Sequence, residues 1–166
     1  MFEQLQLAIV DRLSKVLLWP VYDHSAPIGQ WFGDNATVYK RFGQEGHNGV
    51  DILVPDFTPV LAPCNGIVRY AGNGAGEPLL GNAAGIAILI RHESGMQVGL
   101  AHLSKVFVEE GYMCKAGEVI ALSGHTGATT GAHLHIETLG TPLDVRNGYM
   151  GRVDPLPYMA HPIGGA

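Results

Sequence analysis

Positive charge and long apolar runs are scarce in this chain of 166 residues. Lys and Arg number 10 against 15 Asp and Glu, and the formal net charge of -5 offers no basic surface to nucleic acid or to an anionic membrane. The longest apolar run, 16–22, is interrupted by Pro20 and is far too short to span a bilayer. Because hydrophobic residues make up 46% and charged residues 15%, disorder is excluded and one folded domain is expected.

Cysteine is scarce too, since Cys64 and Cys114 are the whole complement and cannot form a disulfide scaffold. The N-terminus has no positively charged region, and Asp11 and Arg12 interrupt the stretch that would be the apolar part of a signal peptide. We therefore expect synthesis in the cytoplasm without an export signal. Free thiols are favoured over a bridge in that compartment.

Glycine and proline are abundant, with 23 and 10 residues, which favours a turn-rich β architecture. Short apolar runs between glycine-marked turns predict strands, and Glu93-Ser94-Gly95 predicts a hairpin. No helix-length periodic segment separates these strands, so the sheet should be mostly antiparallel. The predicted strands are 51–54, 66–70, 86–90, 97–100, 119–122 and 133–136.

The ends of the chain differ from this central part. Residues 3–18 have apolar side chains at helical spacing and predict an amphipathic helix. We divide the chain into an N-terminal helical segment over 1–20, a main domain over 27–155 and a Pro- and Gly-rich tail over 156–166. The glycine-rich segment 72–85 is expected to be a long flexible loop.

Eight histidines against ten Lys and Arg is an unusual ratio, and two motifs concentrate them. In an extended chain His47 and Asp51 would lie about 13 Å apart, but Asn48-Gly49 permits a turn that brings them together. His133 and His135 project from one face of a predicted strand. Two imidazoles and one carboxylate are ligand types of catalytic zinc sites, in which a fourth position stays open for water. A further histidine, His102, lies in a strand-like segment.

Three ordered blocks resemble the signature blocks of the lysostaphin-type zinc endopeptidases, also called LytM-like or β-lytic metallopeptidases, which are peptidoglycan hydrolases. They are G-H-N-G-V-D (46–51), A-H-L-S (101–104) and G-H-T-G-A-T-T-G-A-H-L-H-I-E (124–137), within a resemblance that covers roughly residues 27–155. The resemblance implies a mostly β, two-sheet antiparallel fold of duplicated hairpins (a duplicated hybrid motif), with the site in a groove. It also implies His47, Asp51 and His135 as zinc ligands, and His102 and His133 as catalytic residues beside the metal-activated water.

The implied activity is cleavage of peptide cross-links in bacterial peptidoglycan, with stem peptides or cross-bridges as partners. Polyglycine and D-alanyl-diaminopimelate cross-links both stay open as substrates.

There is no H-E-x-x-H motif, so the glutamate base of helical zinc proteases is absent and His102 or His133 takes its role. Glu137 either orients one of the two strand histidines or is a solvated or structural carboxylate. Leu100 stands where many relatives carry a tyrosine, which leaves Tyr39 as a weaker candidate for the oxyanion donor.

Three alternative functions stay open. Degenerate relatives act as wall-binding or hydrolase-activating modules, but all five expected side chains are present, which favours an enzyme. A biotinyl or lipoyl carrier needs a lysine at a hairpin tip, usually beside methionine, and Lys115 lies between Cys114 and Ala116. An iron oxygenase or a cupin has similar ligand types, but the oxygenase usually has H-x-D and the cupin a more distant glutamate than Glu137.

The segment 28–35, together with Tyr39 and Phe42, is similar to phage-encoded members of the family. This similarity predicts a protein that reaches the wall in a phage virion or on release at lysis. The N-terminal helix would then be an element for virion assembly or self-association.

Overall fold

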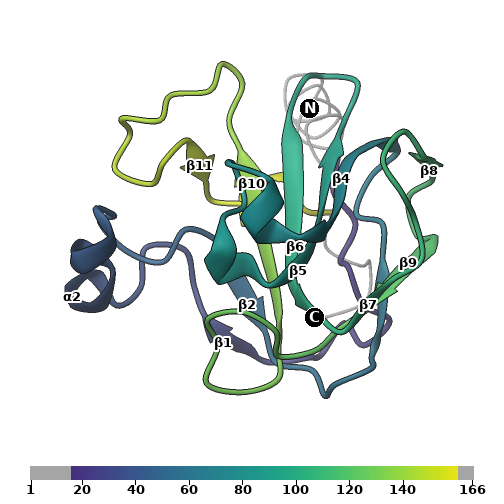
Figure 1. Cartoon of the computed structure of the whole chain (residues 1–166), viewed down its shortest axis with the longest axis horizontal. Coiled ribbons are helices and arrows are strands. Elements are labelled where there is room, and N and C mark those ends of the chain that lie inside the picture. Colours follow the sequence, from purple (N-terminus) through teal and green to yellow (C-terminus); the bar gives the residue numbers. More distant parts are fainter. Residues whose placement is uncertain (1–15, 161–166) are drawn as a thin grey trace, which may run out of the picture.

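The computed structural model describes residues 16–160, which form two antiparallel sheets (Figure 1). The order across the larger sheet is β1 (Ile28–Gln30), β2 (Val50–Ile52), β10 (Leu134–Leu139), β6 (Gln97–Leu103), β5 (Ile86–Arg91), β4 (Gly66–Asn73) and β8 (Met113–Cys114), with β11 (Arg152–Val153) also paired to β10. The smaller sheet has the order β3 (Pro59–Leu61), β9 (Val119–Leu122) and β7 (Lys105–Val106). The predicted fold class is therefore confirmed.

The helices among the described residues are short. They are α2 (Ala36–Tyr39) and the 3-10 helices η1 (Lys40–Phe42), η2 (Gly74–Gly76), η3 (Asn82–Ala84) and η4 (Leu156–Tyr158). None of them is long and apolar enough to cross a membrane.

Each of the six predicted strands is present, with bounds that differ by a few residues. The predicted hairpin at 93–95 joins β5 to β6, where Arg91 pairs with Gln97 and Gly95 has a φ of 90°. The strands that sequence patterns did not reveal are two or three residues long, too short to show alternation.

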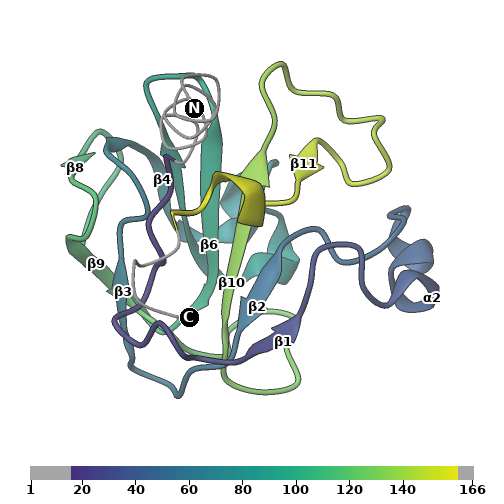
Figure 2. The same cartoon turned by 180° about the vertical axis from the view of Figure 1, so that it is seen from behind.

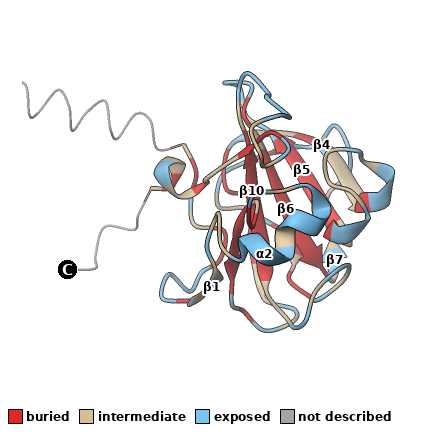
Figure 3. Cartoon of the chain, turned by 90° about the vertical axis from the view of Figure 1, so that its left-hand side faces the viewer, coloured by how far each residue is buried: buried red, intermediate tan, exposed pale blue. Residues whose placement is uncertain are grey.

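The core draws apolar side chains from both sheets, and the buried residues gather along the central strands (Figure 3). On β10, Leu134 and Ile136 point into this core, so His135 and Glu137 lie on the opposite face, as expected from the alternation of a strand. That opposite face also carries a small cluster of Ala84, Ala87 and Ala101. The face that bears the histidines is thereby covered in part by the segment 74–85.

The predicted N-terminal helix over 3–18 lies mostly outside the described residues. Its last three residues, 16–18, are not helical, which differs from the prediction. The backbone N–H of Leu17 donates to the carbonyl of Tyr158 over 2.9 Å, and the N–H of Ala160 donates to the carbonyl of Leu17 over 2.8 Å. Figure 2 shows this segment and η4 on the same face of the larger sheet. Pairing with the chain end thus replaces helical hydrogen bonds at residue 17.

The glycine-rich segment 72–85 is more regular than the predicted flexible loop. Its first residues continue β4 to Asn73, and η2 and η3 follow. Gly85, at a φ of 64°, packs directly against the backbone of Thr126 and Gly127. No side chain fits between these two segments, so glycine permits their close approach.

Candidate metal centre

The register of three neighbouring strands brings the two histidine motifs together. His135 on β10 pairs with Asp51 on β2 and with Ala101 on β6. His47 comes from the turn before β2, and His102 follows Ala101. Residues from three distant parts of the sequence therefore meet at one place in the larger sheet.

Three donor atoms at this place form a nearly equilateral triangle. The Nε2 atom of His47 lies 3.2 Å from Oδ1 of Asp51 and 3.1 Å from Nδ1 of His135, and that Nδ1 lies 2.8 Å from the same Oδ1. A tetrahedral metal with ligand bonds of about 2.0–2.1 Å has its donors about 3.3 Å apart. Because the three residues are buried and the donors already converge, this group fits a metal ion with only small shifts.

Without a metal, Nδ1 of His135 makes hydrogen bonds to Asp51 and His47, so a proton occupies the space between the three donors. Burial opposes ionisation of Asp51, but the hydrogen bonds of His135 and His47 outweigh it and keep the pKa of that carboxyl below its usual range. Burial also disfavours charge on His135, but its hydrogen bonds with Asp51 and Glu137 prevail and raise the pKa of the imidazole to about 9. A metal ion must displace this proton, so metal affinity should increase with pH up to that value.

His102 and His133 flank the triangle. Their ring centroids are 4.7 Å apart, and Nε2 of His133 lies 3.6 Å from Oδ1 of Asp51. Nδ1 of His102 lies 2.8 Å from the carbonyl oxygen of Thr126, and Nδ1 of His133 lies 2.9 Å from that of Gly131. A carbonyl only accepts, so each neutral ring is protonated at Nδ1 and keeps the lone pair of Nε2 free.

A bulge between β5 and β6 changes the direction of the His102 side chain. The register between β5 and β6 shifts between Ile86 and Ile88, and His102 has a φ of 62°. Such bulges redirect side chains, and a positive φ at a non-glycine residue marks a conformation that the surroundings enforce. Burial, followed by the charge of His135, lowers the pKa of His102 to about 4. The ring is therefore neutral at pH 7.

Tyr39, at the end of α2, borders the metal centre. Its ring centroid lies 5.5 Å from that of His47. Burial and the negative charge of Asp51 raise the pKa of its phenol, which therefore stays protonated. Leu100, by contrast, is fully buried in the apolar core. Tyr39 therefore lies beside the metal centre, where the oxyanion donor that Leu100 cannot supply would be needed.

Glu137 is buried, and its Oε2 lies 3.5 Å from Nε2 of His135. The solvated interpretation of this carboxylate is therefore wrong. Sequence reasoning missed Gln30, whose Nε2 lies 3.5 Å from Oδ2 of Asp51, and Arg152, which pairs with Glu137. Gln30 lies in the segment 28–35, whose similarity to phage-encoded members gave it no role at the site, and Arg152 belongs to no recognised motif.

The remaining histidines do not join this group in the part of the chain that is described. His125 forms an exposed pair with Asp56 at 2.9 Å, and His92 contacts Ser94 in the β5–β6 hairpin. His24 is exposed, and His161 lies outside the described residues.

Gly49 leaves room for the ring of His135. A Cβ atom at this position would lie 2.4 Å from the carbonyl oxygen of Ile136, and 2.6 Å from Cε1 and 2.7 Å from Nε2 of that ring. We expect Gly49→Ala to displace the imidazole, weaken metal binding and lower the free energy of unfolding by about 1–3 kcal/mol. Metal titration and urea denaturation would measure both effects. Gly131→Ala is the control, because no atom lies within 4 Å of its Cβ, and equal effects of the two changes would contradict this explanation.

Known sequences similar to this chain include peptidases. The profile of Peptidase family M23 matches residues 45–145. Peptidoglycan DD-endopeptidase ShyA of Vibrio cholerae is 34% identical over 113 residues, which are 67% of this chain and 25% of that protein. Matches to curated relatives span between 17% and 25% of those proteins' own lengths.

Solved structures show the same fold. The catalytic domain of the antimicrobial peptidase lysostaphin from Staphylococcus simulans has a TM-score of 0.66 at 28% identity and covers 81% of this chain and 92% of that one. A zinc containing peptidase from Vibrio cholerae has a TM-score of 0.65 at 30% identity, over 83% of this chain and 38% of that one. The resemblance drawn from the three sequence blocks is thereby confirmed.

Proposed function

The chain belongs to peptidase family M23, and from this premise we propose that it is a zinc-dependent endopeptidase that cleaves peptide cross-links of bacterial peptidoglycan. One observation carries the proposal: the donors of His47, Asp51 and His135 converge, Nε2 of His133 lies 3.6 Å from Oδ1 of Asp51, and the ring of His102 lies beside that of His135, with centroids 5.7 Å apart. A degenerate relative that only binds the wall would not need this complete set. Two imidazoles and a carboxylate that leave a fourth position open are typical of catalytic zinc sites.

In the proposed reaction zinc, when bound, supplies Lewis acidity that activates water and polarises the scissile carbonyl. The chain's own groups then move the protons. His102 is neutral at pH 7, so its free Nε2 can accept the proton of the attacking water, and His133 is placed to share this role. The same imidazoles can return a proton to the leaving amine. The protonated phenol of Tyr39 can donate a hydrogen bond to the oxygen that becomes negative.

The test is mass spectrometry of fragments released from purified sacculi of both cross-link types. Zinc-loaded protein would be compared with a His133→Ala variant. We expect new amine and carboxyl ends at a cross-link with the native chain alone, first of all with DD cross-links, because ShyA is named for them. No release from either wall type, despite one zinc per chain, would overturn the proposal and favour a wall-binding or hydrolase-activating module.

Tyr39→Phe tests the oxyanion role. Removing the phenol hydroxyl should lower kcat by about 10²-fold, the usual cost of losing one oxyanion donor. Zinc affinity should not change, because the phenol is not one of the three converging donors. Steady-state kinetics on a soluble cross-linked peptide would measure the effect. Tyr112→Phe, at an exposed tyrosine bonded to Glu118, is the matched control, and an unchanged kcat in Tyr39→Phe would exclude the role.

A further inference from the structure

A buried ion pair lies directly behind the metal centre. Glu137 and Arg152 are each only 4% exposed. Nη2 of Arg152 donates to Oε1 of Glu137 over 3.0 Å, and Nε donates to Oε2 over 3.1 Å. A guanidinium that donates to both oxygens fixes the plane of the carboxylate as well as its charge. Arg152 therefore determines how Glu137 is oriented.

Glu137 transmits this orientation to His135. Its Oε2 lies 3.5 Å from Nε2 of the imidazole, while Nδ1 of the same ring belongs to the donor triangle. The ring nitrogen that does not bind a metal commonly donates its proton to a carboxylate, which fixes the tautomer and the ring angle. The side-chain amide of Asn48, beside His47, also donates to this Oε2 over 3.4 Å. The carboxylate thus contacts both sides of the metal centre.

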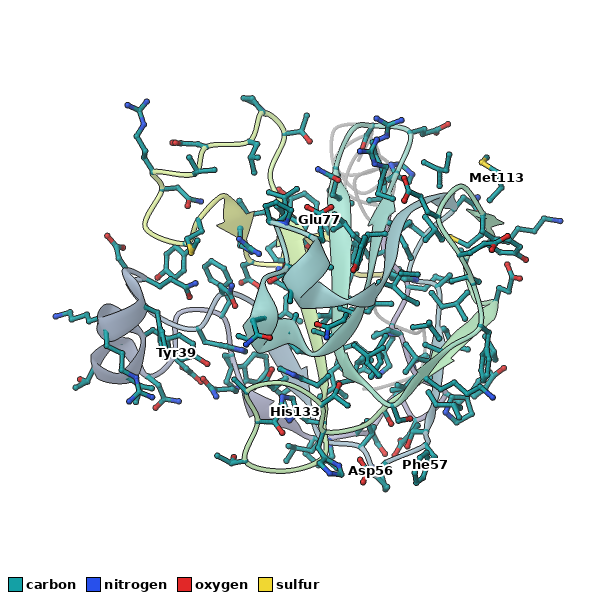
Figure 4. The ribbon with its side chains drawn as sticks, viewed as in Figure 1. Tyr39, Asp56, Phe57, Glu77, Met113 and His133 are labelled. Carbon is teal, nitrogen blue, oxygen red and sulfur yellow. The ribbon has the colours of Figure 1, made fainter. Side chains whose placement is uncertain are left out.

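The other donors of Arg152 hold two loops. Nη1 donates to the carbonyl of Met150 over 2.9 Å, and Nη2 also donates to the carbonyl of Leu79. Leu79 lies in the segment 74–85, which Figure 4 marks with Glu77 in front of β10. One side chain therefore connects β10, the segment before β11 and the segment that covers the histidine-bearing face.

The segment 74–85 also contacts the residues next to the pair formed by His102 and His133. The N–H of Ala128 donates to the carbonyl of Ala83 over 2.9 Å, and the N–H of Ile86 donates to Oγ1 of Thr126 over 3.0 Å. The carbonyl of Thr126 is in turn the acceptor for Nδ1 of His102. Arg152 is thus linked to His135 through Glu137, and to His102 through the segment 74–85 and Thr126.

We propose that Arg152 is a positioning residue of the metal centre, which acts through Glu137 to hold Nδ1 of His135 toward the metal. The inference rests on the proposed zinc-dependent function. A merely structural ion pair would affect only the stability of the fold, because removal of Arg152 leaves the charge of Glu137 buried and uncompensated. A positioning role also sets the affinity and the ligand geometry of the metal.

The experiment measures zinc affinity by chelator competition and the visible spectrum of the Co²⁺-substituted protein, using the full chain. In Arg152→Gln we expect the Co²⁺ bands to shift and zinc affinity to fall by about 10-fold, the low end of the range for loss of a ligand's own hydrogen-bond partner, because Arg152 acts one contact further out, through Glu137. Arg152→Lys keeps the charge but not the two-pronged contact, so its affinity should lie between those of Arg152→Gln and the native chain. If Arg152→Gln does not fold, the zinc affinity and the Co²⁺ spectrum of Arg152→Lys test the proposal.

Ile120→Val is the control, because it weakens the core in the smaller sheet, at a residue outside the Arg152 network. It should lower the temperature of unfolding and leave zinc affinity and the Co²⁺ bands unchanged. Native affinity and native bands in the Arg152 variants, with lower thermal stability alone, would overturn the inference and leave a structural ion pair. Failure of the native chain itself to bind zinc would instead overturn the proposed function and, with it, this inference.

Discussion

Asp51→Asn is expected to lose zinc binding, and with it the release of peptidoglycan fragments. The carboxylate is the only negative charge in the donor triangle, and it lies within 3.2 Å of both imidazole donors. Asparagine keeps the size of the side chain but has no charge to attract a dication. The loss should therefore exceed the roughly 10- to 100-fold expected when only an outer hydrogen-bond partner is removed.

The same change has a distinct signature in the metal-free protein. Asp51 has a lowered pKa, so its pairing stabilises the fold above its usual value of 3.8 and is lost as the pH falls through the native value. His135 has a raised pKa, so its contribution is complete below 6.5 and disappears as the pH rises through about 9. Asp51→Asn should therefore cost most stability between about pH 4 and 6.5, and progressively less toward pH 9.

Chelator competition, sacculus digestion and urea denaturation across this pH range would measure these effects. Asp56→Asn is the matched control, since Asp56 forms an exposed pair with His125 and is not one of the converging donors. It should keep native zinc affinity, activity and pH dependence. A functional zinc-binding Asp51→Asn protein would show that the donor triangle is not the metal site.

The donor triangle could be predicted from the sequence because its information is local. The Asn48-Gly49 turn and the alternation around Leu134 each fix a short stretch of backbone, and the resemblance implies which residues would bind the metal. The larger sheet then needs only one register, in which His135 lies opposite Asp51. Local patterns also predicted the longer strands, whose apolar runs are sufficient to indicate them.

What could not be predicted depends on contacts between distant segments. Arg152 lies in a two-residue strand, and its role arises only because β11 pairs with β10 beside Glu137. Leu17 follows a helical pattern, but its backbone pairs with Met159 at the other end of the chain. At Leu17 a tertiary hydrogen bond outweighs the helical pattern of the local sequence. At Arg152 a tertiary ion pair creates a role that the local sequence does not indicate. Residue spacing predicts neither contact.

His102→Asn should lower kcat by about 10²- to 10⁴-fold, the range typical for loss of a general base. Asparagine suits this position because it tolerates the positive φ of 62°, and its amide can still donate to the carbonyl of Thr126. It has no group that can accept a proton from water at neutral pH. Zinc affinity should stay close to native, because His102 is not among the three converging donors.

The pH profile separates this base from the metal ligands. Burial and the neighbouring charge of His135 lower the pKa of His102 to about 4, so its proton-accepting form predominates throughout the neutral range and is lost only below that value. A fall in wild-type activity that begins above about pH 5 would then come from a group other than His102, such as His135, whose pKa is raised in the metal-free protein. His102→Asn should therefore lower the plateau of kcat against pH without moving its acid limb. A plateau that stays at the native height would assign the base to His133 instead, and a limb that moves would show that His102 itself titrates there, against the low pKa that its burial causes.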